Sequence, residues 1–151
     1  MSDLMKEATN WATMAVPGAE TPEEQRKLFD AMSLAELADT WRALQQVSLR
    51  DQTEGTRATF HYFDSLPHQQ PERALDLILE VLKRETDIAV LLQLGDKFTP
   101  ALLYAHGAIL IDRLERETAG HPQLRWLLGS VIWWTEDAAL EVRLAAIADR
   151  E

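Results

Sequence analysis

The chain contains no cysteine among its 151 residues. This absence excludes disulfide bonds, zinc–thiolate sites, iron–sulfur clusters and thiol nucleophiles together. The chain also lacks the roughly 18 consecutive apolar residues that cross a bilayer. Its first residues, MSDLMKEATNW, lack the basic start and apolar run of a secretion signal. We therefore expect a cytoplasmic protein with no membrane partner.

Basic residues are scarce relative to acidic ones. The chain has 15 Lys+Arg against 25 Asp+Glu, a formal net charge of −10 at pH 7. A surface of this sign repels phosphate backbones, which disfavours nucleic-acid binding, and it accelerates encounters with basic proteins. The charge therefore favours a protein partner, although acidic surfaces are also common in soluble proteins that have none.

No segment shows the two-residue alternation, the β-branched enrichment or the Asn-Gly turns of β-strands. Apolar residues recur at helical spacing instead, as at Leu34, Leu37 and Trp41. Ser33 and Glu36 form a capping-box pattern at the start of that helix, which is predicted over 33–48. Further helices are predicted over 3–16, 22–31, 53–63 (ended by Pro67), 71–84, 87–94 (ended by Gly95), 99–117, 122–134 and 135–149.

Two segments of the chain resemble each other. Residues 82–86 are LKRET and residues 114–118 are LERET. Each segment is followed by a shorter apolar helix that ends at a glycine, Gly95 or Gly129. Helix pairs that repeat in this way are typical of α-solenoids, because each pair buries its apolar face on its neighbour. Chance similarity between two amphipathic helices is the simpler alternative.

The composition is that of a packed globular protein, with 46% hydrophobic and 26% charged residues. We predict an all-α fold of about seven to eight helices. The helices are predicted to form a single domain over 1–151, with repeat-like pairs at 71–95 and 100–129. The architecture would be stacked antiparallel helix pairs, either a HEAT- or armadillo-like α-solenoid or an irregular helical bundle.

Four histidines are the natural candidates for acid–base or metal chemistry. His61 and Asp64 would lie about one helical turn apart, with His68 close by in the sequence. Pro67 separates His68 from the other two, so a solvated helix end is favoured over a metal site with two or three ligands. His106 lies on a leucine-bearing helical face, which indicates a partly buried ring hydrogen-bonded to a carbonyl or carboxylate.

The other residue types give no catalytic motif. His121 precedes Pro122 and is best explained as a helix-start residue. The serines lie outside any G-x-S-x-G pattern. The six glycines are dispersed, so the chain has neither a phosphate-binding loop nor a dinucleotide fingerprint. We expect no cofactor.

Tryptophan is abundant for a chain of this length. The five tryptophans are at positions 11, 41, 126, 133 and 134. Trp126 and Trp133 would share one face of the predicted helix over 122–134, and Trp134 would point about 100° away. An exposed Trp133 or Trp134 would mark a binding surface, because tryptophan is enriched at interface hot spots. Core filling is the simpler role.

Several short motifs between residues 71 and 134 resemble those of a known family. They are Pro71-Glu72-Arg73-Ala74, His106-Gly107, Ile111-Asp112-Arg113-Leu114-Glu115 and the region Pro122…Leu128…Trp133. In these motifs the chain is similar to an uncharacterised family of small bacterial all-helical domains. The resemblance implies a bacterial helical protein, and it carries over no activity and no functional residue.

Together these features favour a non-catalytic protein-binding module. In its most specific form, the protein would be a bacterial immunity protein that neutralises a basic toxin, such as a nuclease or deaminase, by binding it. Trp126, Trp133 and Trp134 are the candidate binding residues.

Two alternatives belong to other classes of protein. One is a small hydrolase or metal-dependent enzyme that uses residues from the set His61, Asp64, His68 and His106. The other is a structural homo-oligomer that buries its tryptophan face at a two-fold interface.

Overall fold

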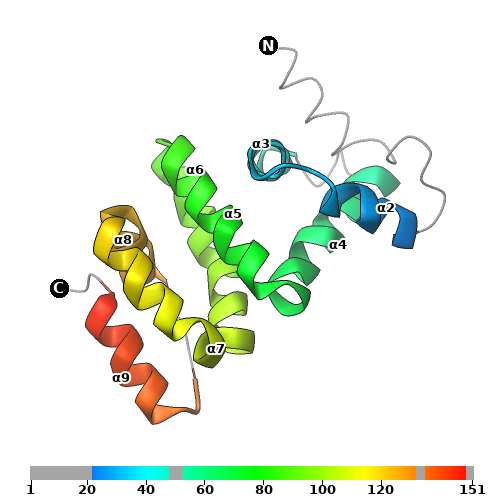
Figure 1. Ribbon diagram of the computed structural model, residues 1–151. Coiled ribbons are helices and arrows are strands. Elements are labelled where there is room, and N and C mark those ends of the chain that lie inside the picture. Colours follow the sequence, from blue (N-terminus) through cyan, green and yellow to red (C-terminus); the bar gives the residue numbers. More distant parts are fainter. Residues whose placement is uncertain (1–21, 48–52, 132–134, 149–151) are drawn as a thin grey trace. The chain divides into compact units, whose positions relative to one another are not determined.

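The computed structural model describes residues 22–47, 53–131 and 135–148. Within these ranges the chain is helical and contains no strand, which confirms the all-α class. Eight α-helices and one π-helix, η2, fall in this part of the chain (Figure 1). In chain order they are α2 (Pro22–Asp30), α3 (Leu34–Gln45), α4 (Glu54–Gln69), α5 (Pro71–Arg84), α6 (Ile88–Gln93), η2 (Leu94–Phe98), α7 (Thr99–Gly120), α8 (Pro122–Ser130) and α9 (Ala138–Ile147). None of these described helices has both the length and the apolar character needed to span a membrane. The helix predicted over 3–16 lies outside the described residues.

Packing divides the chain after Ser65 into two compact units, and each is described by itself. In the first unit, Ser33 begins α3 with the predicted capping box. The Ser33 hydroxyl accepts a hydrogen bond from the Glu36 amide at 3.1 Å, and the Glu36 carboxylate accepts one from the Ser33 amide at 3.3 Å. Two amides at the helix start, which have no partner inside the helix, are thereby satisfied.

Aromatic side chains form much of the core of the first unit. Trp41 on α3 is only 3% exposed. Phe29 of α2 stacks on Tyr62 of α4 with ring centroids 4.7 Å apart. The Tyr62 hydroxyl donates to Asp30 Oδ1 at 2.8 Å, so the ring is buried while its polar end keeps a partner.

Helix α4 passes through Pro67 and ends at Gln69. The prediction that Pro67 ends this helix is therefore wrong. A proline inside a helix removes its own amide bond and crowds the carbonyl four residues earlier, but it leaves later amides free to donate. The Gln70 amide donates to the Leu66 carbonyl at 2.9 Å, which continues the helical pattern beyond the proline.

The second unit is organised around α7 and α8. Helix α7 packs against both α5 and α9, and α8 contacts each of α5, α6, α7 and α9 (Figure 1). The apolar stripes of these helices meet in a common core. Its fully buried side chains include Leu75, Leu77, Ile78, Leu110, Leu114, Leu124 and Leu127.

The backbone from α6 through η2 into α7 is helical without a break. The prediction that Gly95 ends a helix is therefore wrong. A Cβ atom at Gly95 would lie 3.2 Å from a Leu127 methyl carbon and 3.3 Å from one of Val131, so glycine permits close packing there. The π-helix η2 ends just before Thr99 and Pro100. The Thr99 hydroxyl donates to the carbonyl of Leu94, the first residue of η2, at 2.9 Å.

The break in this long helical path occurs at His106, inside α7. Its backbone has φ −139° and ψ 17°, which is not helical. A Cβ atom on the adjacent Gly107 would lie 3.1 Å from a Leu140 methyl carbon of α9, so only glycine fits this contact without a shift. The single domain and the repeat-like pairs at 71–95 and 100–129 stay predictions, and the kink at His106 falls within the second pair.

Helix α9 begins with a side-chain cap, three residues after the start predicted at residue 135. Asp137 is its N-cap residue, and Oδ1 accepts a hydrogen bond from the Leu140 amide at 3.1 Å. Leu140 and Leu144 then face the core and are 5% and 1% exposed. The cap and these two leucines fix the position of α9 beside α7.

The packing around α7 predicts the outcome of a core truncation. Leu114 is 1% exposed, and Leu114→Ala should lower the free energy of unfolding by about 2–5 kcal/mol because it leaves a cavity. Urea denaturation followed by circular dichroism measures this loss. Ile88→Ala, at a side chain 62% exposed, should change the free energy by no more than about 0.5 kcal/mol. Equal losses for the two variants would contradict the assigned core.

Candidate functional site

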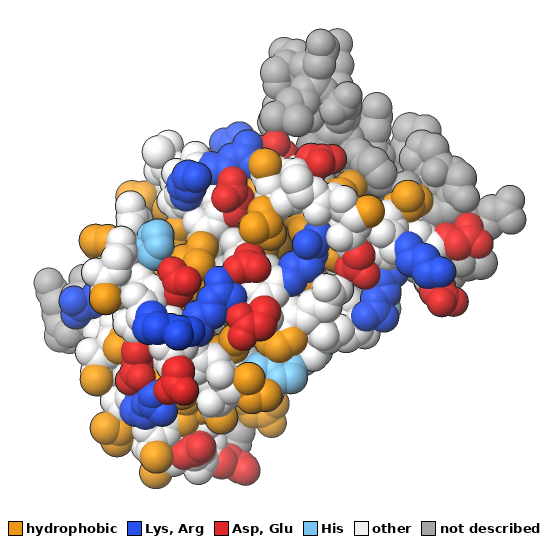
Figure 2. Space-filling model, viewed as in Figure 1, with side chains coloured by type: hydrophobic (Ala, Val, Ile, Leu, Met, Phe, Trp, Pro, Cys, Tyr) orange, Lys and Arg blue, Asp and Glu red, His pale blue; other side chains and the backbone are white. Residues whose placement is uncertain are grey.

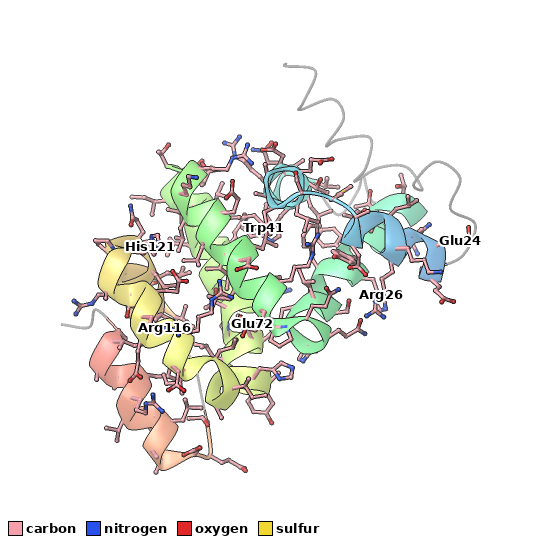
Figure 3. All side chains as sticks on the ribbon, in the orientation of Figure 1. Glu24, Arg26, Trp41, Glu72, Arg116 and His121 are labelled. Atoms are coloured by element: carbon pink, nitrogen blue, oxygen red, sulfur yellow. The ribbon has the colours of Figure 1, made fainter. Side chains whose placement is uncertain are left out.

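Charged side chains connect α5, α7 and α9 across one face of the second unit. We call this set the arginine network. Figure 2 shows basic and acidic side chains intermixed over α5 and α7 in the centre of the view, and Figure 3 labels Glu72 on α5 and Arg116 on α7. The members of the network are Glu72, Asp76, Asp112, Arg113, Glu115, Glu117 and Arg143.

Arg113 joins α7 to α5. Its two terminal nitrogens donate to the carboxylates of Glu72 and Asp76, which are four residues apart and therefore share one side of α5. One of these nitrogens also donates to the Glu72 backbone carbonyl at 3.3 Å. The Arg113 Nε lies 3.6 Å from Glu117 Oε1 on its own helix. The planar guanidinium can serve three carboxylates because its donors point in different directions.

Arg143 joins α9 to the opposite side of α7. Its Nη2 donates to Asp112 Oδ1 at 2.6 Å and to one oxygen of Glu115, and its Nε donates to the other Glu115 oxygen at 3.2 Å. Helix α7 therefore presents Arg113 toward α5 and two carboxylates toward α9. The Asp112 side chain is 80% exposed, so this pair remains accessible to a partner.

The ion pairs shift the pKa values of their members. Partial burial lowers the pKa of Arg113, but the hydrogen bonds to Asp76 and Glu72 outweigh it and leave the pKa raised. Hydrogen bonds to Glu115 and Asp112 raise the pKa of Arg143, and the hydrogen bond from Arg143 lowers the pKa of Glu115. These shifts favour the charged forms of Arg113, Arg143 and Glu115.

The network carries more acid than base. Its five carboxylates face two guanidinium groups, a formal excess of three negative charges. Most of the carboxylates are held by hydrogen bonds from an arginine on a neighbouring helix. Within the network the carboxylates are in excess and already ordered, and Arg73, Lys83, Arg84 and Arg116 on the same helices lie outside it.

His106 has the kind of partner that its sequence position predicted. Its ring is half-buried, and Nε2 lies 2.7 Å from the backbone carbonyl of His68. A carbonyl only accepts, so Nε2 carries the hydrogen in this contact. The His68 carbonyl is in the last turn of α4, where helical carbonyls have no partner inside the helix. The bond therefore ties the end of α4 to the kink in α7.

The other histidine candidates are not assembled into a site. His61 and Asp64 are exposed on α4, and His68 meets His106 only through its backbone. In the part of the chain that the structure describes, no three His, Asp or Glu side chains are grouped so that they could hold a metal ion. His121 is the N-cap residue of α8, as its position before Pro122 predicted, and its Nε2 lies 3.4 Å from Glu117 Oε2.

Only one of the three candidate tryptophans lies within the described residues. Trp126 is half-buried on α8, while Trp133 and Trp134 lie outside the described residues. The prediction that one helix runs from Pro122 to Trp134 is wrong, because α8 ends at Ser130 and Val131 is extended, with φ −85° and ψ 138°. The helical face that Trp126 and Trp133 were predicted to share required that continuous helix.

Sequence reasoning missed the arginine network. It assigned no role to Glu72 or Asp76, and both bind Arg113. A signal was present, because two carboxylates four residues apart on one helix are spaced to hold an arginine of a neighbouring helix. The motifs around Glu72 and Arg113 that carried the family resemblance are the segments that this network joins.

Comparison with known proteins extends that resemblance. A family model described as "Family of unknown function (DUF6869)" matches residues 45–151, from the end of α3 through α9. The comparisons with curated proteins and with solved structures found no match.

The two arginines should differ in their effect on stability. The Arg113 side chain is 20% exposed, and Arg113→Met should lower the free energy of unfolding by about 1 kcal/mol because three carboxylates lose a common partner. Arg143→Met should cost less, since the Arg143 side chain is 42% exposed and its carboxylates can be rehydrated. Urea denaturation of both variants tests this order, and a larger loss for Arg143→Met would contradict it.

The ion pair between Arg143 and Glu115 also predicts that the stability of the fold depends on pH. Because the folded-state pKa of Glu115 is lowered, the pair stabilises the fold above the ordinary glutamate pKa and loses this effect as the pH falls through the folded-state value. Arg143→Gln should raise the titration midpoint of Glu115 toward the ordinary value, as measured by NMR of its side-chain carboxyl carbon. Arg116→Gln removes the same charge from α7 and should leave the midpoint nearly unchanged. An unchanged midpoint in Arg143→Gln would show that the ion pair does not form.

Proposed function

This chain belongs to the family of unknown function DUF6869, and we propose that it is a non-catalytic protein-binding module. Its contact surface includes the arginine network. The observation that carries the proposal is the ordered set of carboxylates in the arginine network, where two arginines hold carboxylates of neighbouring helices.

An ordered acidic surface suits the binding of a basic protein. Binding ordinarily costs free energy to immobilise long side chains at an interface. Glu72, Asp76 and Glu115 are already held by arginines, so less of that cost remains when a partner arrives. The formal excess of negative charge would accelerate the encounter and orient a positively charged surface toward this face.

In its most specific form, the proposal makes the protein a bacterial immunity protein that acts in the cytoplasm and occludes a basic toxin. The net charge of −10 supports a basic partner, and the absence of cysteine is in keeping with a reducing compartment. Trp126, half-buried on α8, is a candidate contact at the edge of the second unit. Trp133 and Trp134 remain candidates from the sequence alone.

Affinity capture from the native cells tests the proposal. The immobilised chain should retain one basic protein in stoichiometric amount at physiological salt and release it at high salt, because screening weakens charge-driven association. Glu72→Gln combined with Asp112→Asn should weaken binding of that partner by roughly tenfold. The measurement is a calorimetric titration of the purified partner.

A matched variant separates the site from overall charge. Glu23→Gln combined with Glu24→Gln also removes two negative charges, but from the exposed first turn of α2 in the other unit. This control should bind the partner as the wild type does. Equal weakening in both double variants, or capture that is insensitive to salt, would overturn the proposal.

A further inference from the structure

The two most exposed large hydrophobic side chains among the described residues lie on adjoining helices. Ile109 on α7 is 70% exposed and Val142 on α9 is 69% exposed. The ion pair between Asp112 and Arg143 joins these same stretches of the two helices. Ile109 lies three residues before Asp112 and four before Arg113, so it points outward from α7 between the sides that face α9 and α5, and Val142 is the sequence neighbour of Arg143. The two apolar side chains are therefore carried by neighbouring turns of packed helices.

Helix α9 has apolar residues on its outer side as well as on its core side. Leu140 and Leu144 face the core, and the exposed side of the helix is also mostly apolar, with Glu141 and Arg143 at its flanks. Figure 2 shows hydrophobic side chains gathered over α9 at the lower left of the view, with acidic side chains beside them. An exposed apolar side opposite the core side is unusual for a surface helix, whose outer side is ordinarily polar. We call the exposed set the α7–α9 apolar face, formed by Ala108, Ile109, Ala139, Val142 and Ala146.

The charges around the α7–α9 apolar face are predominantly negative. Apart from Arg113, which binds α5, the acids on this part of α7 and at the start of α9 outnumber the bases by three. Arg143 and two of these acids, Asp112 and Glu115, are already engaged with one another. A surface that covers this face would therefore find a complement in positive charge at its edges. The charged residues are Asp112, Glu115, Arg116, Glu136, Asp137, Glu141 and Arg143.

We propose that the α7–α9 apolar face binds an amphipathic α-helix of a partner protein, with apolar residues against Ile109 and Val142 and lysine or arginine at its edges. The inference rests on the proposed function and names the segment by which the partner is bound. Two packed helices lie about 8–10 Å apart, so a third helix laid along them contacts side chains of both.

A second copy of the chain fits this face less well than a basic helix. A two-fold contact would place the acidic border of one copy against the same border of the other. Each copy also carries a formal net charge of −10, so the two would repel each other at long range.

Two synthetic peptides provide the test. Each is a helix of about 18 residues, long enough to form in isolation, with the same leucine and alanine stripe. One peptide has lysine along both edges of the stripe and the other has glutamate. Fluorescence anisotropy measures binding of each peptide to the full chain, to Ile109→Gln with Val142→Gln, and to the control Ile88→Gln with Leu92→Gln. The control removes two exposed apolar side chains from α6, at 62% and 48% exposure, without changing the charge.

The lysine peptide should bind the wild type and the α6 control equally, and it should bind the α7–α9 variant about tenfold or more weakly. The glutamate peptide should bind none of them. Equal affinity of the lysine peptide for both double variants, equal binding of the two peptides, or no binding of the lysine peptide would overturn the proposal. Sedimentation that shows a wild-type dimer, lost in the α7–α9 variant, would also overturn it by identifying a second copy as the occupant.

The docking proposal and the proposed function can fail independently of each other. If Ile109→Gln with Val142→Gln captures the native basic partner as well as the wild type does, the docking proposal fails and the proposed function stands. If no native partner is captured while the lysine peptide binds as described, the proposed function fails and the docking property of this face stands. Circular dichroism of each variant confirms that the helices remain folded.

Discussion

The second unit depends on the placement of Arg113 between two helices. Its guanidinium satisfies Glu72 and Asp76 on α5 while remaining part of α7, so the two helices have one favourable register. Partly exposed ion pairs add little free energy, and the core leucines supply most of the stability. What the pairs add is specificity, because a shift of α5 along α7 would leave charged groups without their partners.

The ion pairs of Arg113 and Arg143 also order the side chains of the candidate site. With Arg113 directed to α5 and Arg143 reaching across from α9, helix α7 keeps its carboxylates ordered on the face between them. The kink at His106 and the contact of Gly107 with Leu140 bring α9 close enough for this bridge to form. Charge, order and an adjoining exposed apolar surface are thus consequences of how three helices pack.

Features set by neighbouring residues could be predicted from the sequence. The caps at Ser33 and Asp137 follow from local spacing, and both are present. The partner type of His106 followed from its helical face, and the carbonyl of His68 confirms it. The caps depend on three or four neighbouring residues and the partial burial of His106 on one helical periodicity, whereas the particular carbonyl that His106 binds comes from a distant helix.

Features set by distant residues could not be predicted in this way. Judged from its neighbours in the sequence, Gly95 is expected to end a helix, but its role is set by close packing against Leu127 of α8 and Val131 just after it. Arg113 finds its carboxylate partners 37 and 41 residues earlier in the chain, and no periodicity specifies that pairing.

The central claim is that α5, α7 and α9 bind a partner protein. Hydrogen–deuterium exchange of the chain with its captured partner tests this claim most directly. We expect the backbone amides of α5, α7 and α9 to gain protection from exchange. Protection confined to α2 and α3 would contradict the claim.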